Sequence, residues 1–300
     1  MKKPIKIVLV SVASLVVLAV AAAGVVSRLS DRKLHRIVQL PPLQVTFAPA
    51  EGQLERGEYL FKTRGCMDCH GVDGSGHVVV DEGGLFVRAP NITSGGASPT
   101  RSYTDTDWVR TLRHGVKPSG QPLLVMPSED YARMTDADLG AIVAYVRSLP
   151  PASTGAAEIH EFPLPIKAAY ALGAIKDAAE KIDHTAPPPQ EVGDTLVARG
   201  QYVAQGCTGC HGPHFSGGKI PGTPPSWPPA ANLTSAPDSA MSRYTTAEQF
   251  KTMLRSGKRP DGSAISEVMP FKALAFMNDA ELDALYAFLK TLEPRPSGQR

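Results

Sequence analysis

Hydrophobic positions along the chain of 300 residues follow first a continuous and then a periodic pattern. Residues 7–26 are uncharged and almost wholly apolar, and such a run of 20 is about the length that a helix needs to cross a bilayer. Beyond it, apolar residues recur three and four positions apart, as on one face of an amphipathic helix. No segment alternates at period two over a useful length, so the pattern predicts an all-α fold in which strands are minor.

The periodic segments form two similar sets, each with an opening helix, a short middle helix and a closing helix. Gly115 and Gly257 follow the middle helices, and glycine commonly ends a helix. Thr135 and Asn278 are good N-caps for the closing helices, with an acidic residue three positions further on. The pattern predicts helices over 54–62, 106–113, 136–149, 196–205, 246–255 and 279–292, and an Ala-rich helix over 166–181 between the two sets.

The apolar N-terminal run follows lysines at positions 2, 3 and 6. Because basic residues stay on the cytoplasmic side, the rest of the chain is expected in the periplasm, on the outer face of a bacterial cytoplasmic membrane. A cleaved signal peptide is the alternative, since the alanines at 21–23 resemble a cleavage site. The apolar region of a signal peptide usually has about 7–15 residues. The longer run here favours an uncleaved single-pass anchor in residues 1–30, followed by a stalk in 31–50.

Composition narrows the class of protein. The formal net charge is +2, and without the lysines of the anchor the chain is nearly neutral, which argues against a nucleic-acid-binding protein. The mean hydropathy of −0.12 excludes a protein with many membrane spans. The length suggests two domains.

The two sets of helices belong to an internal repeat with an offset of 141 to 143 residues. This period is far longer than that of solenoid repeats, so it indicates duplicated domains at 51–150 and 194–300, with a linker at 151–193. The matching motifs are Arg56-Gly57-Glu58-Tyr59 with Arg199-Gly200-Gln201-Tyr202, Pro90-Asn91-Ile92-Thr93 with Ala231-Asn232-Leu233-Thr234, and Val125-Met126-Pro127 with Val268-Met269-Pro270.

The chain has four cysteines, and in an oxidising compartment two disulfides are the default expectation. Their spacing indicates different chemistry, because Cys-x-x-Cys-His is the attachment sequence of a c-type haem. Cysteines three apart on a helical turn point the same way, so both sulfurs can bond the vinyl groups of one porphyrin, and the next residue places an imidazole under the iron. The two copies predict two covalently bound haem c groups; they are Cys66-Met67-Asp68-Cys69-His70 and Cys207-Thr208-Gly209-Cys210-His211.

A haem iron needs a second axial ligand, and a methionine sulfur raises the reduction potential. Met126 and Met269 occupy matching loop positions, and each is followed by a proline that fixes the backbone direction. Met134 and Met277 also match, but each precedes an N-cap, where packing onto the closing helix explains it. Met126 and Met269 are therefore the predicted distal ligands. A core role for them, or a second histidine from a loop as the ligand, is the alternative.

These features resemble the class I cytochromes c. The motifs Arg-Gly-x-Tyr, Pro-Asn-Ile-Thr and Met-Pro, with a closing helix that ends Ala144-Tyr145-Val146, are most similar to the cytochrome subunits of membrane-bound alcohol and gluconate dehydrogenases. The resemblance covers nearly all of both units. Those subunits typically carry three haem units where this chain has two, and they are commonly bound to the membrane by means other than a long N-terminal anchor.

The resemblance implies a fold in which the opening and closing helices cross, with the haem between them and the Met-Pro loop on the distal side. It also implies that Gly57 and Gly200 allow close approach to the closing helices. By the same resemblance, the carbonyl of Pro90 accepts a hydrogen bond from the ring of His70, and Ala231 takes that place in the second unit.

The sequence thus predicts a dihaem electron-transfer protein and not an enzyme. The two haems are expected to lie close enough to exchange electrons. The expected donor is a dehydrogenase subunit or a quinol-side donor, and the expected acceptor is an oxidase or a small soluble cytochrome or cupredoxin. A dihaem enzyme such as a cytochrome c peroxidase is the alternative, but it needs an iron with a vacant or displaceable ligand, whereas both units have the same Met-Pro loop.

Overall fold

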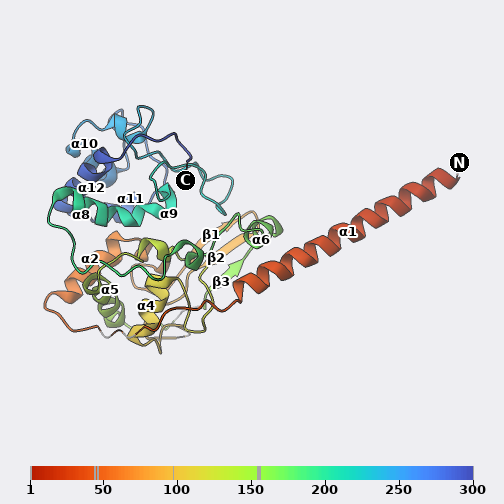
Figure 1. Cartoon of the computed structure of the whole chain (residues 1–300), viewed down its shortest axis with the longest axis horizontal. Coiled ribbons are helices and arrows are strands. Elements are labelled where there is room, and N and C mark those ends of the chain that lie inside the picture. Colours follow the sequence, from red (N-terminus) through yellow and green to blue (C-terminus); the bar gives the residue numbers. More distant parts are fainter. Residues whose placement is uncertain (1, 44, 46, 97, 154–156, 300) are drawn as a thin grey trace.

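The computed structural model describes residues 2–43, 45, 47–96, 98–153 and 157–299. Two helical domains lie against each other, and the long helix α1 (Lys2–Leu34) projects away from them (Figure 1). Within the described residues the strands form one three-stranded sheet. The prediction of a helical fold with little strand is therefore confirmed.

The two domains repeat the same order of helices. Every predicted opening, middle and closing helix is present, with both ends within one residue of the prediction. The first domain contains α2 (Gln53–Thr63), α3 (Cys66–His70), α4 (Asp105–His114), the 3-10 helix η1 (Ser128–Asp130) and α5 (Asp136–Ser148). The second contains α8 (Leu196–Ala204), η2 (Gln205–Cys207), α9 (Thr208–His211), η3 (Ala240–Arg243), α10 (Ala247–Ser256), α11 (Phe271–Leu274) and α12 (Asp279–Thr291).

In each domain the opening helix packs against the closing helix, α2 against α5 and α8 against α12. A glycine lies at each of these contacts. A Cβ atom on Gly57 would lie 2.1 Å from the carbonyl oxygen of Ala141, and one on Gly200 would lie 1.9 Å from that of Ala284. Only glycine fits at such distances, so the close approach that the resemblance implies is present in both domains.

The helix termini follow from local hydrogen bonds. The side chains of Thr135 and Asn278 accept the backbone N–H groups three residues further on, so both predicted N-caps are confirmed. The middle helices end at Gly115 and Gly257, which have φ of 64° and 69°. A left-handed glycine satisfies the last carbonyls of a helix, and this explains why both helices stop there.

The segment between the domains differs from the prediction of one helix over 166–181. It forms α6 (Leu164–Ala171) and α7 (Ala178–Lys181), separated by a turn. Gly173 has φ of 81°, which ends the first helix, and Asp177 begins the second by accepting the N–H of Glu180. The helix was predicted too long because alanine content outweighed these two local signals.

A small sheet was not predicted. The hairpin β1 (Val78–Glu82) and β2 (Leu85–Arg88) turns at Gly83 and Gly84, both with positive φ. The strand β3 (Ile159–Glu161) of the segment between the domains adds to β2 in antiparallel pairing. Two glycines between runs of Val, Leu and Phe are a hairpin signal.

Helix α1 covers residues 2–30 of the predicted anchor and continues four residues beyond it; residue 1 lies outside the described residues. Its segment Ile5–Leu34 is long and apolar enough to cross a membrane, and none of its apolar stretch is buried against the rest of the chain. The helices α1 and α6 pack against each other, and Lys33 donates a hydrogen bond to the carbonyl of Tyr170 at 3.0 Å. Arg36 bonds both carboxylate oxygens of buried Asp177, at 2.6 and 3.0 Å. The base of α1 is therefore fixed to the segment between the domains, and just beyond α1 the N–H of Val38 bonds the carbonyl of Gly120 in the first domain at 2.9 Å.

Candidate haem sites

Each Cys-x-x-Cys-His sequence forms one helical turn. In the first domain all five residues lie in α3, between Gly65 and Gly71 with φ of 80° and 77°. In the second domain Cys207 ends η2 and the other four residues form α9, which Gly212 ends with φ of 79°. The two cysteines of each motif are thereby placed on the same side of the turn. Among the described residues no disulfide joins these four cysteines.

The first cysteine of each motif packs against the core of its domain. Burial raises the pKa of Cys66 and of Cys207 to about 12, and that of Cys69 to about 11. These thiols are therefore neutral near pH 7.

Both motif histidines donate a hydrogen bond to a backbone carbonyl. The Nδ1 atom of His70 lies 2.9 Å from the oxygen of Pro90, and that of His211 lies 2.7 Å from the oxygen of Ala231. A carbonyl only accepts, so Nδ1 carries the proton and Nε2 keeps its lone pair. Burial also lowers the pKa of His70, which favours the neutral ring. A neutral imidazole is the form that binds a metal.

The backbone after each motif histidine turns back and bonds the carbonyl of that histidine. Gly76 donates its N–H to the carbonyl of His70 at 2.8 Å, and Gly217 does the same to His211 at 2.9 Å. A Cβ atom on Gly76 would lie 2.4 Å from the oxygen of Ala89. The prediction did not include these turn glycines, although their equal distance from the two motifs could have indicated them.

Two buried asparagines form turns directly after the residues whose carbonyls accept the histidine N–H groups. Asn91 accepts hydrogen bonds from the N–H and the hydroxyl of Thr93, both at 2.8 Å, and Asn232 accepts the same pair from Thr234. Each asparagine follows the residue whose carbonyl accepts the histidine. The two asparagines occupy matching positions of the repeat. Their hydrogen bonds show that they form a turn.

The methionines divide as the repeat predicts. Met126 and Met269 lie in loops outside the helices, are half-buried, and pack against the same cores as Cys66 and Cys207 respectively. Met134 and Met277 are members of the buried cores themselves. In each domain the first motif cysteine and the loop methionine therefore pack against one core, and the second cysteine and the histidine lie in the same motif turn as that first cysteine. This donor set fits haem c, with sulfur for the vinyl groups and nitrogen and sulfur for iron.

In each domain the opening and closing helices cross, and a Cys-x-x-Cys-His turn follows directly after the opening helix. This arrangement defines a haem-binding electron carrier of the cytochrome type. The comparison with protein families agrees. The family model for cytochrome c matches the chain twice, over residues 54–150 and 197–293. The chain belongs to the cytochrome c family, with two tandem domains, and such domains imply covalently bound haem c.

Several curated proteins are similar over most of the chain. The gluconate 2-dehydrogenase cytochrome c subunit of Pantoea cypripedii is 26% identical over 277 residues, which are 82% of this chain and 61% of that protein. The fructose dehydrogenase cytochrome subunit of Gluconobacter japonicus is 26% identical over 87% of this chain and 57% of its own length. A dihaem cytochrome c-type protein of Cereibacter sphaeroides is 28% identical over 81% of this chain and 87% of its own length.

The chain spans about 60% of the length of the gluconate and fructose dehydrogenase subunits that it matches. Those relatives are named as cytochrome subunits, which transfer electrons and do not carry the dehydrogenase reaction. The prediction of an electron-transfer protein and not an enzyme agrees with these names.

Proposed function

We propose that this chain is a membrane-anchored dihaem cytochrome c that relays electrons from a dehydrogenase or quinol-side donor to an acceptor. The first haem would be bonded to Cys66 and Cys69, with His70 and Met126 as iron ligands. The second would be bonded to Cys207 and Cys210, with His211 and Met269 as iron ligands. The observation that carries the proposal is the duplicated motif turn whose histidine donates Nδ1–H to a fixed carbonyl.

Bound haem supplies one-electron chemistry, in which the iron alternates between the ferric and ferrous states. The chain's own residues would bind the haem, orient the ligand side chains and exclude water from the sites. The carbonyls of Pro90 and Ala231 orient the imidazoles and increase their basicity. The loop methionines supply a soft sulfur, and the apolar cores around Cys66 and Cys207 keep the sites dry, which raises the potential.

The remaining expectations form part of the same proposal. Residues 1–30 would anchor the chain by a single span in the bacterial inner membrane, with 31–50 as a stalk. The domains at 51–150 and 194–300, joined by the linker 151–193, would lie in the periplasm. The lysines before the apolar run support this orientation by the positive-inside rule. The relatives' names support a dehydrogenase subunit as donor, and an oxidase, a small cytochrome or a cupredoxin would be the acceptor.

A peroxidase remains the competing class, but the two domains present matching histidine bonds and matching methionine loops. No difference between them among the described residues favours a vacant iron in one domain. We therefore do not propose that activity.

The test is the optical spectrum of the oxidised chain purified from membranes. The weak methionine-to-ferric-iron band near the red end is expected at the intensity of two haems. A band at half that intensity, or rapid turnover of peroxide, would favour the peroxidase. Proteins captured with the chain from solubilised membranes would identify the donor, and a dehydrogenase is the expected result.

A further inference from the structure

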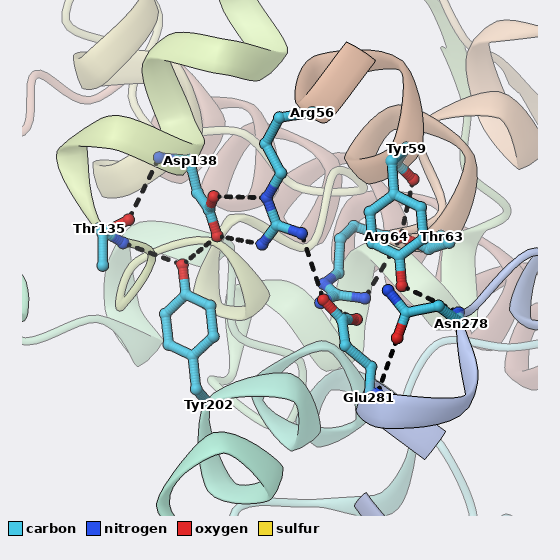
Figure 2. Close-up of polar contacts among 9 residues, drawn as sticks. All are labelled: Arg56, Tyr59, Thr63, Arg64, Thr135, Asp138, Tyr202, Asn278 and Glu281. Carbon is cyan, nitrogen blue, oxygen red and sulfur yellow. Dashed lines mark hydrogen bonds and ion pairs between the residues drawn. The ribbon is translucent and has the colours of Figure 1, made fainter. Parts of the chain in front are cut away.

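Two tyrosines at matching positions of the repeat form matching bonds between the domains (Figure 2). The hydroxyl of Tyr202, in α8, accepts the N–H of Thr135 at 3.1 Å and donates to Asp138 at 2.8 Å. The hydroxyl of Tyr59, in α2, accepts the N–H of Asn278 at 3.1 Å. Thr135 and Asn278 are the N-caps of the closing helices. Each opening helix thus binds the start of the other domain's closing helix.

Arginines of the first domain strengthen this contact. Arg56 binds both oxygens of Asp138 at 2.8 Å in its own domain and reaches Glu281 of the second domain at 3.3 Å. Arg64 binds the other oxygen of Glu281 at 2.7 Å. The side chains of Arg64 and Glu281 are only 7% and 16% exposed, so loss of one partner leaves a poorly solvated charge.

The same interface joins the methionine loop of the first domain to the haem motif of the second. Asp130 ends the 3-10 turn that begins two residues after Met126. Its carboxylate accepts hydrogen bonds from the hydroxyl of Thr208 at 2.8 Å and from the N–H of Gly209 at 2.9 Å. Thr208 and Gly209 are the two residues between the cysteines of the second motif.

The methionine loop of the second domain lies across a pocket from the haem motif of the first. Asp68, between the cysteines of the first motif, lines a pocket together with residues 267–272. That segment contains Met269. Each methionine loop therefore faces the haem motif of the other domain.

We propose that these reciprocal contacts position the two haem sites for direct electron exchange within the chain. We call them the clasp: Arg56, Tyr59, Arg64, Tyr202 and Glu281 with the N-caps Thr135 and Asn278. One electron would pass from the reduced site to the oxidised site, with no proton transferred and no bond made or broken. The inference rests on the proposed haem ligation. The clasp side chains are positioning residues, because none of them is an attachment cysteine or a proposed iron ligand.

The alternative is two independent carriers joined by a linker. In that case the interdomain hydrogen bonds would form and break freely, and the exchange rate would depend on chance encounters of the domains. The pseudo-symmetry of the tyrosine bonds and the withdrawal of Arg64 and Glu281 from water favour the fixed arrangement.

The decisive variant is Glu281→Lys in the full chain, which places a third cation beside Arg56 and Arg64. Asp279→Lys is the matched control. It changes the net charge equally and lies in the same first turn of α12, but Asp279 pairs with Lys251 and Arg255 of its own domain. Two quantities are measured: the rate of electron exchange between the haems after rapid one-electron reduction, and deuterium uptake by peptides covering 131–139 and 205–211.

Glu281→Lys is expected to lower the exchange rate at least about tenfold relative to the control, the factor that corresponds to about 1.4 kcal/mol. It should also speed deuterium uptake in both peptides, while both haem spectra stay native. The double variant Arg64→Glu/Glu281→Lys restores opposite charges and should recover part of the rate. An unchanged rate in Glu281→Lys, or equal losses in Glu281→Lys and Asp279→Lys, would overturn the clasp.

A milder pair of variants covers the case in which Glu281→Lys fails to accumulate. Tyr59→Phe/Tyr202→Phe removes only the two interdomain hydroxyls. Tyr286→Phe is its control, because that hydroxyl donates to Tyr244 within the second domain. Faster exchange of the Thr135 and Asn278 amides in the double variant alone supports the clasp, and equal exchange in both refutes it. Haem content is measured separately. Fewer than two haems per chain would contradict the proposed haem binding, whereas the amide exchange rates test the clasp.

Discussion

A single backbone carbonyl decides which nitrogen each motif histidine can offer to a metal. The bond from Nδ1 to Pro90 or Ala231 leaves the lone pair on Nε2, and the turn glycines Gly76 and Gly217 bond the histidines' own carbonyls. In the proposed function the loop methionine would complete the donor set. At this scale each proposed site depends on four side chains and one carbonyl.

The first prediction concerns the loop methionines. Met126→Ala and Met269→Ala should each lower one of the two reduction potentials and leave the haem covalently bound, because a methionine ligand raises the potential. Potentiometric titration of the purified chain gives both values. Met134→Leu and Met277→Leu are matched controls in the buried cores and should leave both potentials unchanged. A native pair of potentials in either loop variant would remove that methionine from the ligand set.

At the scale of elements, each domain is held by the crossing of its opening and closing helices. Leu60 and Phe61 of α2 lie in the same buried core as Leu139 and Val143 of α5. The close approach of the two backbones is possible only because the crossing residue has no side chain.

Gly57→Ala and Gly200→Ala should therefore destabilise the domain that carries them. An added methyl group would overlap a backbone carbonyl, and overpacking of this kind typically costs about 1–3 kcal/mol. Thermal unfolding should show a fall in Tm of about 4–8 °C for each kcal/mol in a domain of this size. Gly206→Ala is the control, since the one atom near its Cβ position is 3.8 Å away. Equal Tm values for all three variants would contradict the account of the crossing.

Sequence periodicity and caps predicted the six domain helices because those signals are local. Helix 166–181 was predicted too long since Gly173 and Asp177 end one helix and start another within its Ala-rich run. The hairpin had a local signal in Gly83 and Gly84 that was overlooked, whereas the pairing of β3 with β2 joins segments far apart in the sequence and is not local information. The tyrosine contacts could not be predicted for the same reason. The repeat marked Tyr59 and Tyr202 as matching, but only the structure shows that they bind across domains.

At the scale of the whole molecule, α1 and the two domains form one connected body. Lys33 and Arg36, at the base of α1, bind Tyr170 and Asp177. The orientation of the first domain relative to the base of α1 is thereby restricted.

A chain that begins at residue 31 behind a cleavable signal peptide should be recovered in the soluble periplasmic fraction with both haems. The reason is that the apolar stretch of α1 is exposed and makes no core contact with the domains. The full chain, fractionated in parallel, should remain with the membrane. Retention of the shortened chain in the membrane would mean that another surface binds lipid or a membrane partner.

The contact between the domains should also depend on pH. Burial, with a smaller contribution from the neighbouring Glu129, raises the pKa of Asp130 to about 7. Because this folded-state pKa lies above the unfolded value, the native state binds the additional proton between about pH 4 and 7. The stabilisation from the protonated carboxyl is therefore complete below about pH 4 and is lost as the pH rises to about 7.

Asp130→Asn should flatten this part of the pH profile of Tm. The asparagine oxygen can still accept the hydrogen bonds of Thr208 and Gly209, but the side chain does not titrate. Thermal unfolding between pH 4 and 7 compares the two chains. An identical slope in both would show that Asp130 is not the group responsible.

The central claim is that two haem c groups are bonded to this chain, one through each motif. The most direct measurement is the number of haems that remain with the denatured polypeptide, from the pyridine haemochrome spectrum and the intact mass of the same sample. The account predicts two for the native chain and one each for Cys66→Ala/Cys69→Ala and Cys207→Ala/Cys210→Ala. A colourless denatured chain, or one whose mass contains fewer than two haems, would contradict it.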